Sequence, residues 1–465
     1  MTELWQMGAL ELAATIRAKE ASSREVLEAH LDRVDKINGG LNAIVRVLAD
    51  EARAAADAAD AALAGGVELG PLHGVPCTVK ENIDLAGTPT TQGLELMKDA
   101  IAPIDAPSSG RMRAAGAIPF ARTNLPDLGL RVHTHSQLHG LTRNPWNPNV
   151  TAGGSSGGEG SALASGMSPI GLGNDIGGSL RNPANCCGIA SIKPTTGVVP
   201  TATVIPPIDS PLAPQVMSVE GPMARRVADV RCGLEIVAGQ DLRDPTSLPV
   251  VLTDAEPGER MRIAVLAEPP GGSTDSGIAD AIRAVGDRLS DAGHDVVEAT
   301  PPDYEVVLEL WSSLLLGELR EMRPMLDEVM GEGGKALIEA TSADLPPTTL
   351  TGQFELHMER YRLMREWSEF YTEHPILLSP TWSSPAFAHD ADIDGSIDMI
   401  EVIRPVLPAN FLGFPAAVTP AGLADAMPVG VQVMGDRFHD LRCLTVAAEI
   451  ESLVGPLTPI DPITN

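Results

Sequence analysis

The chain has 465 residues, and 33 Lys and Arg residues against 62 Asp and Glu residues give it a formal net charge of −29. This charge argues against binding to nucleic acid, because phosphate contacts need a basic surface, and against an anionic membrane. The 5 Cys residues form no C-x-x-C pair and no run of about 18 apolar residues occurs, so we expect a cytoplasmic protein without a zinc knuckle or membrane helix.

Helices and strands alternate along the first part of the chain. Apolar residues recur with helical spacing over residues 22–37, a short apolar segment at 41–48 favours a strand, and the Ala-rich residues 51–64 favour a surface helix. Residues 75–80 alternate between apolar and polar side chains. This pattern predicts a strand that ends near Lys80 and places the Lys80 side chain on the face opposite the apolar ones.

The alternation continues to the end of the chain. Further strands are predicted at residues 117–121, 168–173, 262–266, 295–297, 376–378, 416–419 and 429–433. Further helices are predicted at residues 108–116, 226–238, 277–292, 304–330, 352–372 and 438–453. The Pro- and Ser-rich stretch 200–220 is predicted to be a long loop. Alternating elements favour an α/β sheet, and no strong linker or repeat divides the chain, so we expect a single domain.

Six consecutive Gly or Ser residues at 153–158 admit several interpretations. A flexible linker is disfavoured because apolar segments follow at once. A phosphate-binding loop is disfavoured because Glu159, and not a Lys, follows the last Gly. The segment also matches G-x-S-x-G, the nucleophile elbow of α/β-hydrolases, with Ser155 as nucleophile and His389 or His439 as the downstream His. That alternative stays open.

A second Gly-Ser cluster follows a predicted strand at residues 175–179. Consecutive Gly residues allow backbone N–H groups to converge on one point, as an oxyanion hole requires. Ser179 at the end of the cluster would place a hydroxyl beside those donors. A plain tight turn is the alternative interpretation.

The two clusters, GGSSGG at 153–158 and DIGGSLR at 175–181, resemble the amidase signature family. The resemblance covers about residue 70 to 435, through matching motifs at residues 74–82, 123–126, 144–146, 153–158, 175–181, 187–189, 193–195, 221–224 and 428–432. The spacing is also similar to that of the family, since Lys80 and Ser155 are 75 positions apart and Ser155 and Ser179 are 24 apart.

The resemblance implies roles for individual residues. Ser179 matches the nucleophile of the family, Ser155 its bridging serine beside a cis peptide bond, and Lys80 its base. The oxyanion N–H groups would come from Ile176, Gly177, Gly178 and Ser179, and the structural support of the site from Gly154, Ser156, Asp175 and Arg181. The resemblance implies neither a cofactor nor a metal for this chemistry.

A lysine can act as the base only when it is neutral. Its ordinary pKa is about 10.4, and burial lowers this value because it disfavours the charged form. The apolar neighbours Val75, Cys77 and Val79 make a buried Lys80 plausible. The ten histidines, His133 and His135 among them, are expected to be structural or at the surface, although His133 and His135 lie in a segment that could reach the pocket.

The resemblance also implies an architecture. We expect one domain over residues 1–465, with a central mixed, twisted β-sheet covered by helices on both faces. The catalytic core would span about residues 70–240. Variable segments at about 200–218 and 304–372 would form a lid, and Gly129, Leu130 and Arg131 would face the substrate.

The activity implied is hydrolysis of C–N bonds in linear amides through an acyl-enzyme. Ile176 lies where transamidation subunits of the family tend to carry Thr, so the chain resembles a stand-alone bacterial acylamidase more closely. Acyl amides, anilides, small carbamates or urethanes, and esters are the expected substrates, and a monomer or homodimer is the expected state. Two alternatives are an amidotransferase subunit of a glutamine-dependent complex and a relative that has lost activity.

Overall fold

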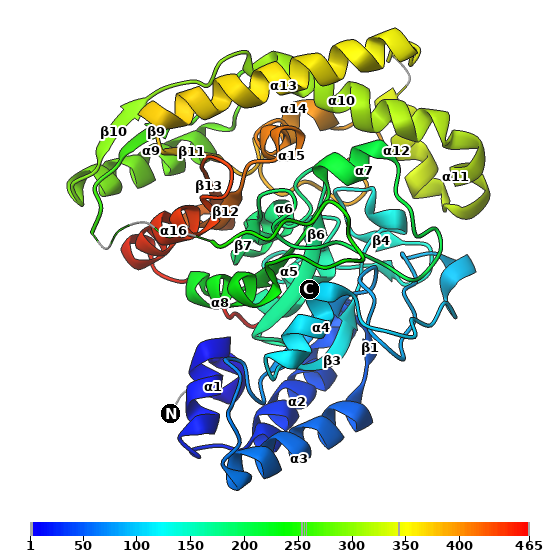
Figure 1. Cartoon of the computed structure of the whole chain (residues 1–465), viewed down its shortest axis with the longest axis vertical. Helices are drawn as coiled ribbons and strands as arrows, with labels where there is room; N and C mark the ends of the chain where they lie inside the picture. Colours follow the sequence, from blue (N-terminus) through cyan, green and yellow to red (C-terminus); the bar gives the residue numbers. More distant parts are fainter. Residues whose placement is uncertain (1–2, 253, 255, 257, 343–344, 464–465) are drawn as a thin grey trace.

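One 11-stranded mixed sheet forms the centre of the molecule, within the residues that the structure describes (3–252, 254, 256, 258–342 and 345–463). The computed structural model orders the strands β1-β3-β2-β6-β8-β7-β12-β13-β11-β9-β10 (Figure 1). Their bounds are β1 Ile44–Val47, β2 Pro76–Lys80, β3 Ile118–Thr123, β6 Ile170–Asp175, β7 Ala190–Lys193, β8 Val219–Ala224, β9 Arg262–Val265, β10 Asp295–Glu298, β11 Ile376–Pro380, β12 Ala416–Ala424 and β13 Met427–Met434. A small hairpin joins β4 His135–Ser136 to β5 Gly140–Leu141.

The sheet combines parallel and antiparallel pairs. Strands β3, β2 and β6 run parallel to one another, as do β11, β9 and β10. Between these two groups, β8, β7, β12 and β13 pair antiparallel with their neighbours, and β1 lies antiparallel on the β3 edge. The predicted single α/β domain with a mixed sheet is therefore confirmed.

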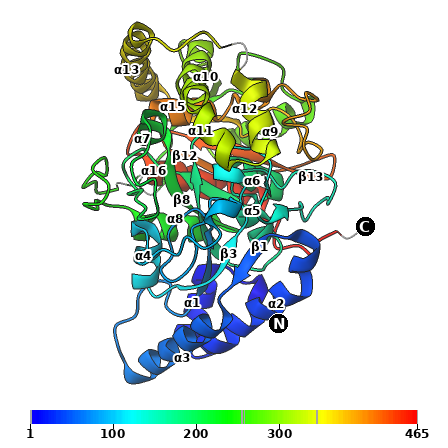
Figure 2. The same cartoon turned by 90° about the vertical axis from the view of Figure 1, so that its right-hand side faces the viewer.

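Helices cover both faces of the sheet. Figures 1 and 2 show α1–α3 at one end of the molecule and α10 and α13 at the opposite end. The helix bounds are α1 Ala9–Arg17, α2 Ser23–Leu41, α3 Ala49–Gly65, α4 Pro107–Ala114, α5 Gly157–Ala164, α6 Arg181–Cys187, α7 Leu212–Met217, α8 Val227–Val237, α9 Ser276–Asp291, α10 Tyr304–Glu321, α11 Arg323–Val329, α12 Glu332–Ser342, α13 Leu350–Glu373, α14 Met399–Ile403, α15 Leu407–Leu412 and α16 Asp440–Val454. Within the described ranges, none of these helices combines the length and apolar composition that crossing a membrane requires.

Period-two alternation divides the strand residues between two cores. In β9, Ile263 and Val265 pack with helices α8, α9 and α16, whereas Ala264 between them packs with α10, α13 and α15. In β2, Cys77 and Val79 belong to the first of these cores. Lys80 is fully buried on the other face, next to the segment that leads into α5. The prediction that its side chain opposes the apolar ones is confirmed.

Two predicted elements differ from the structure. The helix predicted at 304–330 is two helices, α10 and α11, and the break falls where Arg323-Pro324 begins the second one, because proline cannot continue the hydrogen-bond ladder of the first. The loop predicted at 200–220 contains α7, which forms because Ala213 and Met217 are buried in the second core. Strand β8 also begins inside that stretch, at Val219.

Candidate active site

Lys80 ends strand β2 with its ammonium group surrounded by oxygen atoms. Its Nζ lies 2.7 Å from Ser155 Oγ, 2.9 Å from Ser156 Oγ and 2.6 Å from Asn174 Oδ1. Burial lowers the pKa of Lys80 to about 7, and the charges of Asp175, Glu159 and Glu220 oppose this shift without reversing it. With this pKa, Lys80 is present in both its charged and its neutral form near neutral pH.

The serine loop lies between β5 and α5. Ser155 is buried, and the peptide bond between Gly154 and Ser155 is cis. Gly154 packs closely against the backbone of residues 131–133. A Cβ added at this position would come within 2.5 Å of Val132 C and 2.6 Å of His133 N. Only glycine fits such close backbone contact. The arrangement holds the Ser155 hydroxyl at 2.7 Å from Lys80 Nζ.

Ser179 follows the turn that leaves β6 at Asp175. The N–H groups of Ile176, Gly177 and Ser179 form no hydrogen bond with any described residue, so they are free to bind an incoming oxygen atom. Gly178 differs from the sequence prediction, because its N–H donates to Asp175 Oδ1 at 2.8 Å. The N–H group of Gly178, one of the four predicted oxyanion donors, is thus used in a hydrogen bond within the loop.

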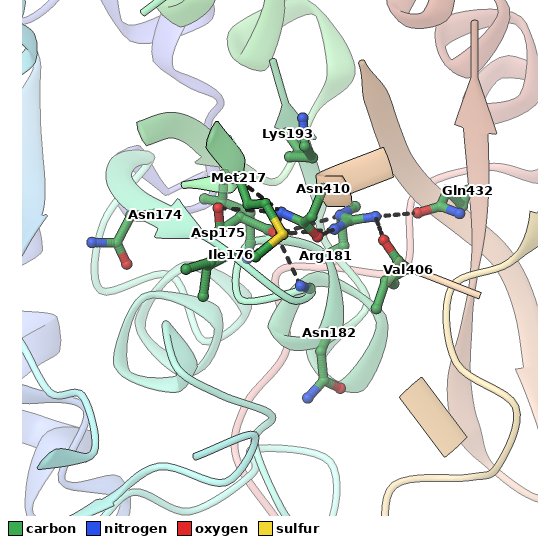
Figure 3. Close-up of polar contacts among 12 residues, drawn as sticks. Asn174, Asp175, Ile176, Arg181, Asn182, Lys193, Met217, Val406, Asn410 and Gln432 are labelled. Atoms are coloured by element: carbon green, nitrogen blue, oxygen red, sulfur yellow. Dashed lines mark hydrogen bonds and ion pairs between the residues drawn. The ribbon is translucent and has the colours of Figure 1, made fainter. Parts of the chain in front are cut away.

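A buried ion pair supports this loop (Figure 3). Arg181 donates from Nε and Nη2 to Asp175, at 3.0 Å and 2.9 Å, and from Nη1 to Gln432 Oε1 at 2.6 Å. Asn410 accepts from Arg181 Nη2 at 2.5 Å and donates to Asp175 Oδ1 at 3.0 Å. Burial alone would raise the pKa of Asp175, but the charge and hydrogen bonds of Arg181 hold it well below its ordinary value.

Ser155 and Ser179 line the same cleft, which has a volume of about 310 Å³. Asn174, Ile176 and Glu220 also line it, as does the segment 201–211, which forms one of its walls. Ser179 is 6% exposed, so its hydroxyl is accessible from the cleft but not from the bulk surface. Burial raises the pKa of Glu220 to about 8.

An apolar side pocket opens from this cleft at Ser179. Gly129 and Leu130, which the sequence predicts to face the substrate, line both spaces. Helix α10 contributes Trp311, Leu315 and Leu319 to the side pocket. The remaining lining residues are Val132, Ile176, Gly177, Leu316, Leu337, Ile338, Thr341, Met399, Ile400 and Ile403. The side pocket can therefore hold an apolar group beside Ser179.

Arg131 does not face the cleft, which corrects the sequence prediction. Its guanidinium is buried and donates to Asp392 at 2.6 Å and 2.9 Å and to Asp390 at 2.8 Å. A buried guanidinium needs a carboxylate partner, and no local pattern around Arg131 indicates that residues some 260 positions away would supply it. No histidine lines the cleft or the side pocket among the described residues, so the nucleophile-elbow alternative lacks its His base.

Two polar residues of the site were not predicted from the sequence. Asn174 contacts Lys80, and Asn410 bridges Asp175 and Arg181. A signal for Asn410 was present, because it is the one polar residue in the otherwise apolar α15 segment LPANFL. A polar residue in such a segment is usually satisfied by a specific partner. The partner itself is evident only from the fold.

Comparison with known proteins extends the similarity over nearly the whole chain. The Amidase family model matches residues 25–444. An indoleacetamide hydrolase from Bradyrhizobium diazoefficiens is 40% identical over 459 residues, which cover 98% of this chain and 88% of the relative. One subunit of the glutamyl-tRNA(Gln) amidotransferase from Salinispora arenicola is 31% identical over 494 residues, which cover 99% of both chains. The crystal structure of a bacterial aryl acylamidase superposes with a TM-score of 0.84 at 27% identity, covering 97% of each chain.

Proposed function

The chain belongs to the amidase family and hydrolyses amide C–N bonds, and we propose that Ser179 is its nucleophile, Ser155 its proton relay and Lys80 its base. One observation carries this proposal: Lys80 Nζ lies 2.7 Å from Ser155 Oγ, and Ser155 shares a cleft with Ser179. A serine hydroxyl becomes nucleophilic when an adjacent base removes its proton, and a lysine with a pKa of about 7 can be that base.

The three oxygens around Lys80 Nζ determine the direction of its lone pair. Asn174 Oδ1 carries no proton and therefore accepts one from Nζ. Ser156 Oγ donates its own proton to the backbone carbonyl oxygen of Asn174 at 3.4 Å. Ser156 Oγ can therefore accept the second Nζ proton. The lone pair of a neutral Lys80 then faces the Ser155 hydroxyl, which can donate its proton to Nζ.

In the proposed reaction, Ser179 Oγ attacks the carbonyl carbon while its proton passes to Ser155 Oγ and the Ser155 proton passes to Lys80 Nζ. The C–N bond breaks, and the departing nitrogen receives a proton back along the same relay. An acyl ester on Ser179 remains. Water attacks this ester while the relay again moves one proton, and the carboxylic acid leaves. Each turnover consumes one amide and one water and returns Lys80 to its neutral form.

The developing oxyanion would be stabilised by main-chain donors. The N–H groups of Ile176, Gly177 and Ser179 are the candidates, because that of Gly178 is bonded to Asp175. Preorganised donors of this kind stabilise a transition state because they do not have to reorient when the charge develops.

The substrates we propose are small amides with an apolar acyl group, foremost aryl-substituted acetamides. The side pocket at Ser179 is lined by Trp311, Leu315 and other apolar side chains, which favours an aromatic ring there. The names of two relatives, indoleacetamide hydrolase and aryl acylamidase, support the same class. Cleavage of anilides, small carbamates and esters remains a prediction for the same acyl-transfer chemistry.

The variable segments form part of this proposal. Residues 201–211 and helices α10 to α12 line the cleft and side pocket, and we assign them the role of a substrate-selecting cover over a catalytic core at about residues 70–240. Helix α13 lines neither space in the described chain, so the proposed cover ends before it. A subunit of an amidotransferase is the second candidate, supported by the 31% identity to such a protein.

Labelling with a fluorophosphonate and peptide mapping by mass spectrometry tests the assignment. We expect an adduct on Ser179 in the purified chain and in a Ser396→Ala control, whose substituted serine is exposed and lines neither the cleft nor the side pocket. We expect none in Ser179→Ala. An adduct on Ser155 would overturn the assignment. If the chain alone is neither labelled nor able to release ammonia from phenylacetamide, the amidotransferase role becomes the better explanation.

A further inference from the structure

A second group of chemically active side chains lies outside the cleft. His133 and His135 come from the segment before and at the start of β4, and Asp390 comes from the loop after β11. One ligand atom from each residue lies within 4.8 Å of the other two. His133 Nε2 is 3.9 Å and His135 Nδ1 is 3.6 Å from Asp390 Oδ1. The fold thus joins residues more than 250 positions apart.

His133 has an unpartnered nitrogen that points into this group. The side chain is fully buried, and Nδ1 lies 2.9 Å from Thr151 Oγ1, whereas Nε2 has no hydrogen-bond partner among the described residues. A neutral imidazole that donates Nδ1–H to an oxygen and leaves Nε2 free is the form in which histidine binds metals.

The separations fit one ion held in common. Zinc–nitrogen and zinc–oxygen bonds are about 2.0–2.2 Å long, so two ligands of one tetrahedral ion lie about 3.3–3.6 Å apart. The His135–Asp390 distance of 3.6 Å lies at the upper end of this range, and the His133–Asp390 distance of 3.9 Å is slightly longer. Asp390 Oδ1 accepts from Arg131 at 2.8 Å, but Oδ2 has no hydrogen bond within the described part of the chain and remains available.

The charges around the group favour a cation. Asp390 borders a surface groove of about 590 Å³ that is also lined by Asp127, Glu332 and Asp394. Arg131 is the opposing charge, and it is already paired with the buried Asp392. The side chains of His135 and Asp390 are 43% and 45% exposed, so an ion and its water ligands can enter from solvent.

We propose that His133, His135 and Asp390 bind one divalent first-row transition ion, with Zn²⁺ as the best match and water completing its coordination. Two imidazoles and one carboxylate form a ligand set typical of such ions, which leaves positions open for solvent. The three residues lie outside the cleft and the side pocket that contain Ser179. The ion would connect the segment that supports Gly154 to the loop at residues 388–392 and stabilise the fold there.

Equilibrium dialysis of the EDTA-treated full-length protein against ZnCl₂, with metal quantified by mass spectrometry, measures the site. We expect one zinc per chain, and affinity at least about tenfold weaker in His135→Ala and in Asp390→Asn, as loss of a ligand requires. His357→Ala is the matched control, because His357 is half-buried on α13 and lies outside the group. This variant should bind zinc like the unmodified protein.

Cobalt provides a geometric readout. Co²⁺ bound by two imidazoles and a carboxylate should give visible absorption bands, and His135→Ala should lose them while retaining amide hydrolysis, since His135 does not line the cleft. Zinc should also raise the melting temperature of the unmodified protein and not that of His135→Ala. Dialysis that finds no zinc, or equal zinc in all variants, would overturn the proposal whether or not the chain hydrolyses amides.

Discussion

Arg181 donates two hydrogen bonds to Asp175, from Nε to Oδ2 at 3.0 Å and from Nη2 to Oδ1 at 2.9 Å, with both side chains fully buried. The same carboxylate accepts the backbone N–H groups of Gly178 and Leu180, the residues on either side of Ser179. The ion pair therefore sets the conformation of the turn that carries Ser179. Its effect on the site is one of positioning, because Arg181 does not line the cleft.

Asp175→Asn should destabilise the protein by about 3–5 kcal/mol, because it leaves the guanidinium of Arg181 buried without a counter-charge. Urea unfolding measures this change. Glu95→Gln is the control, since Glu95 and Lys98 form an ion pair with side chains 56% and 54% exposed, and its loss should cost less than about 1 kcal/mol. Equal costs in the two variants would contradict the supporting role of the pair.

Activity should rise with pH through about 7. Burial lowers the pKa of Lys80 to about 7, and only the neutral amine can take the Ser155 proton. Below this pKa, kcat/KM should fall about tenfold for each unit of pH. The Glu220→Gln variant shows whether Lys80 or Glu220 is the group that titrates, because Glu220 lines the cleft and burial raises its pKa to about 8. A rising limb that disappears in Glu220→Gln would assign it to Glu220.

Replacing Lys80 by Met should lower kcat by about 10²–10⁴, the usual contribution of a general base. The side chain is fully buried and its three contacts are the hydroxyls of Ser155 and Ser156 and the amide oxygen of Asn174, so the loss is one of proton transfer and local hydrogen bonding. Steady-state kinetics with phenylacetamide tests this expectation. A Lys80→Met enzyme with unchanged kcat would exclude Lys80 as the base.

Gly154→Ala should remove most activity. A Cβ at this position would come within 2.5 Å of Val132 C and 2.8 Å of Arg131 O, so the serine loop would have to move away from the backbone of residues 131–133. Displacement of a catalytic group by about 1 Å can cost about 100-fold in rate. Gly39→Ala is the matched control, because Gly39 lies exposed in α2 with no atom within 4 Å of the added Cβ.

The control should be slightly stabilising, by about 0.5–1 kcal/mol, since alanine favours a helix more than glycine does. Full activity in Gly154→Ala would show that the close backbone contact is not needed to hold Ser155.

Leu319→Trp should narrow the side pocket. Leu319 lines both the cleft and the side pocket, so kcat/KM for phenylacetamide should fall at least about tenfold while that for acetamide changes little. Leu310→Trp on the same helix is the control, because Leu310 lines a different groove. A Leu319→Trp variant that loses both substrates equally would place the acyl group elsewhere.

The local patterns of the sequence determined much of this protein. Period-two alternation in residues 75–80 placed Lys80 opposite the apolar core, and the helices predicted at 226–238 and 277–292 lie within a residue or two of α8 and α9. The resemblance of the motifs around Lys80, Ser155 and Ser179 to the amidase signature family predicted that the three residues belong to one site. The strand alternation and the helix patterns are short-range features, so the residues that produce them are neighbours in the chain.

Long-range partners were decided by the tertiary structure alone. The sequence predicts Arg131 to face the substrate, but the fold brings Asp392 to its guanidinium. Asn410, His133 and Asp390 likewise obtain their neighbours from elements far along the chain. Hydrogen bonds and ion pairs depend on distances of a few ångströms, which no local pattern encodes between segments more than 200 residues apart.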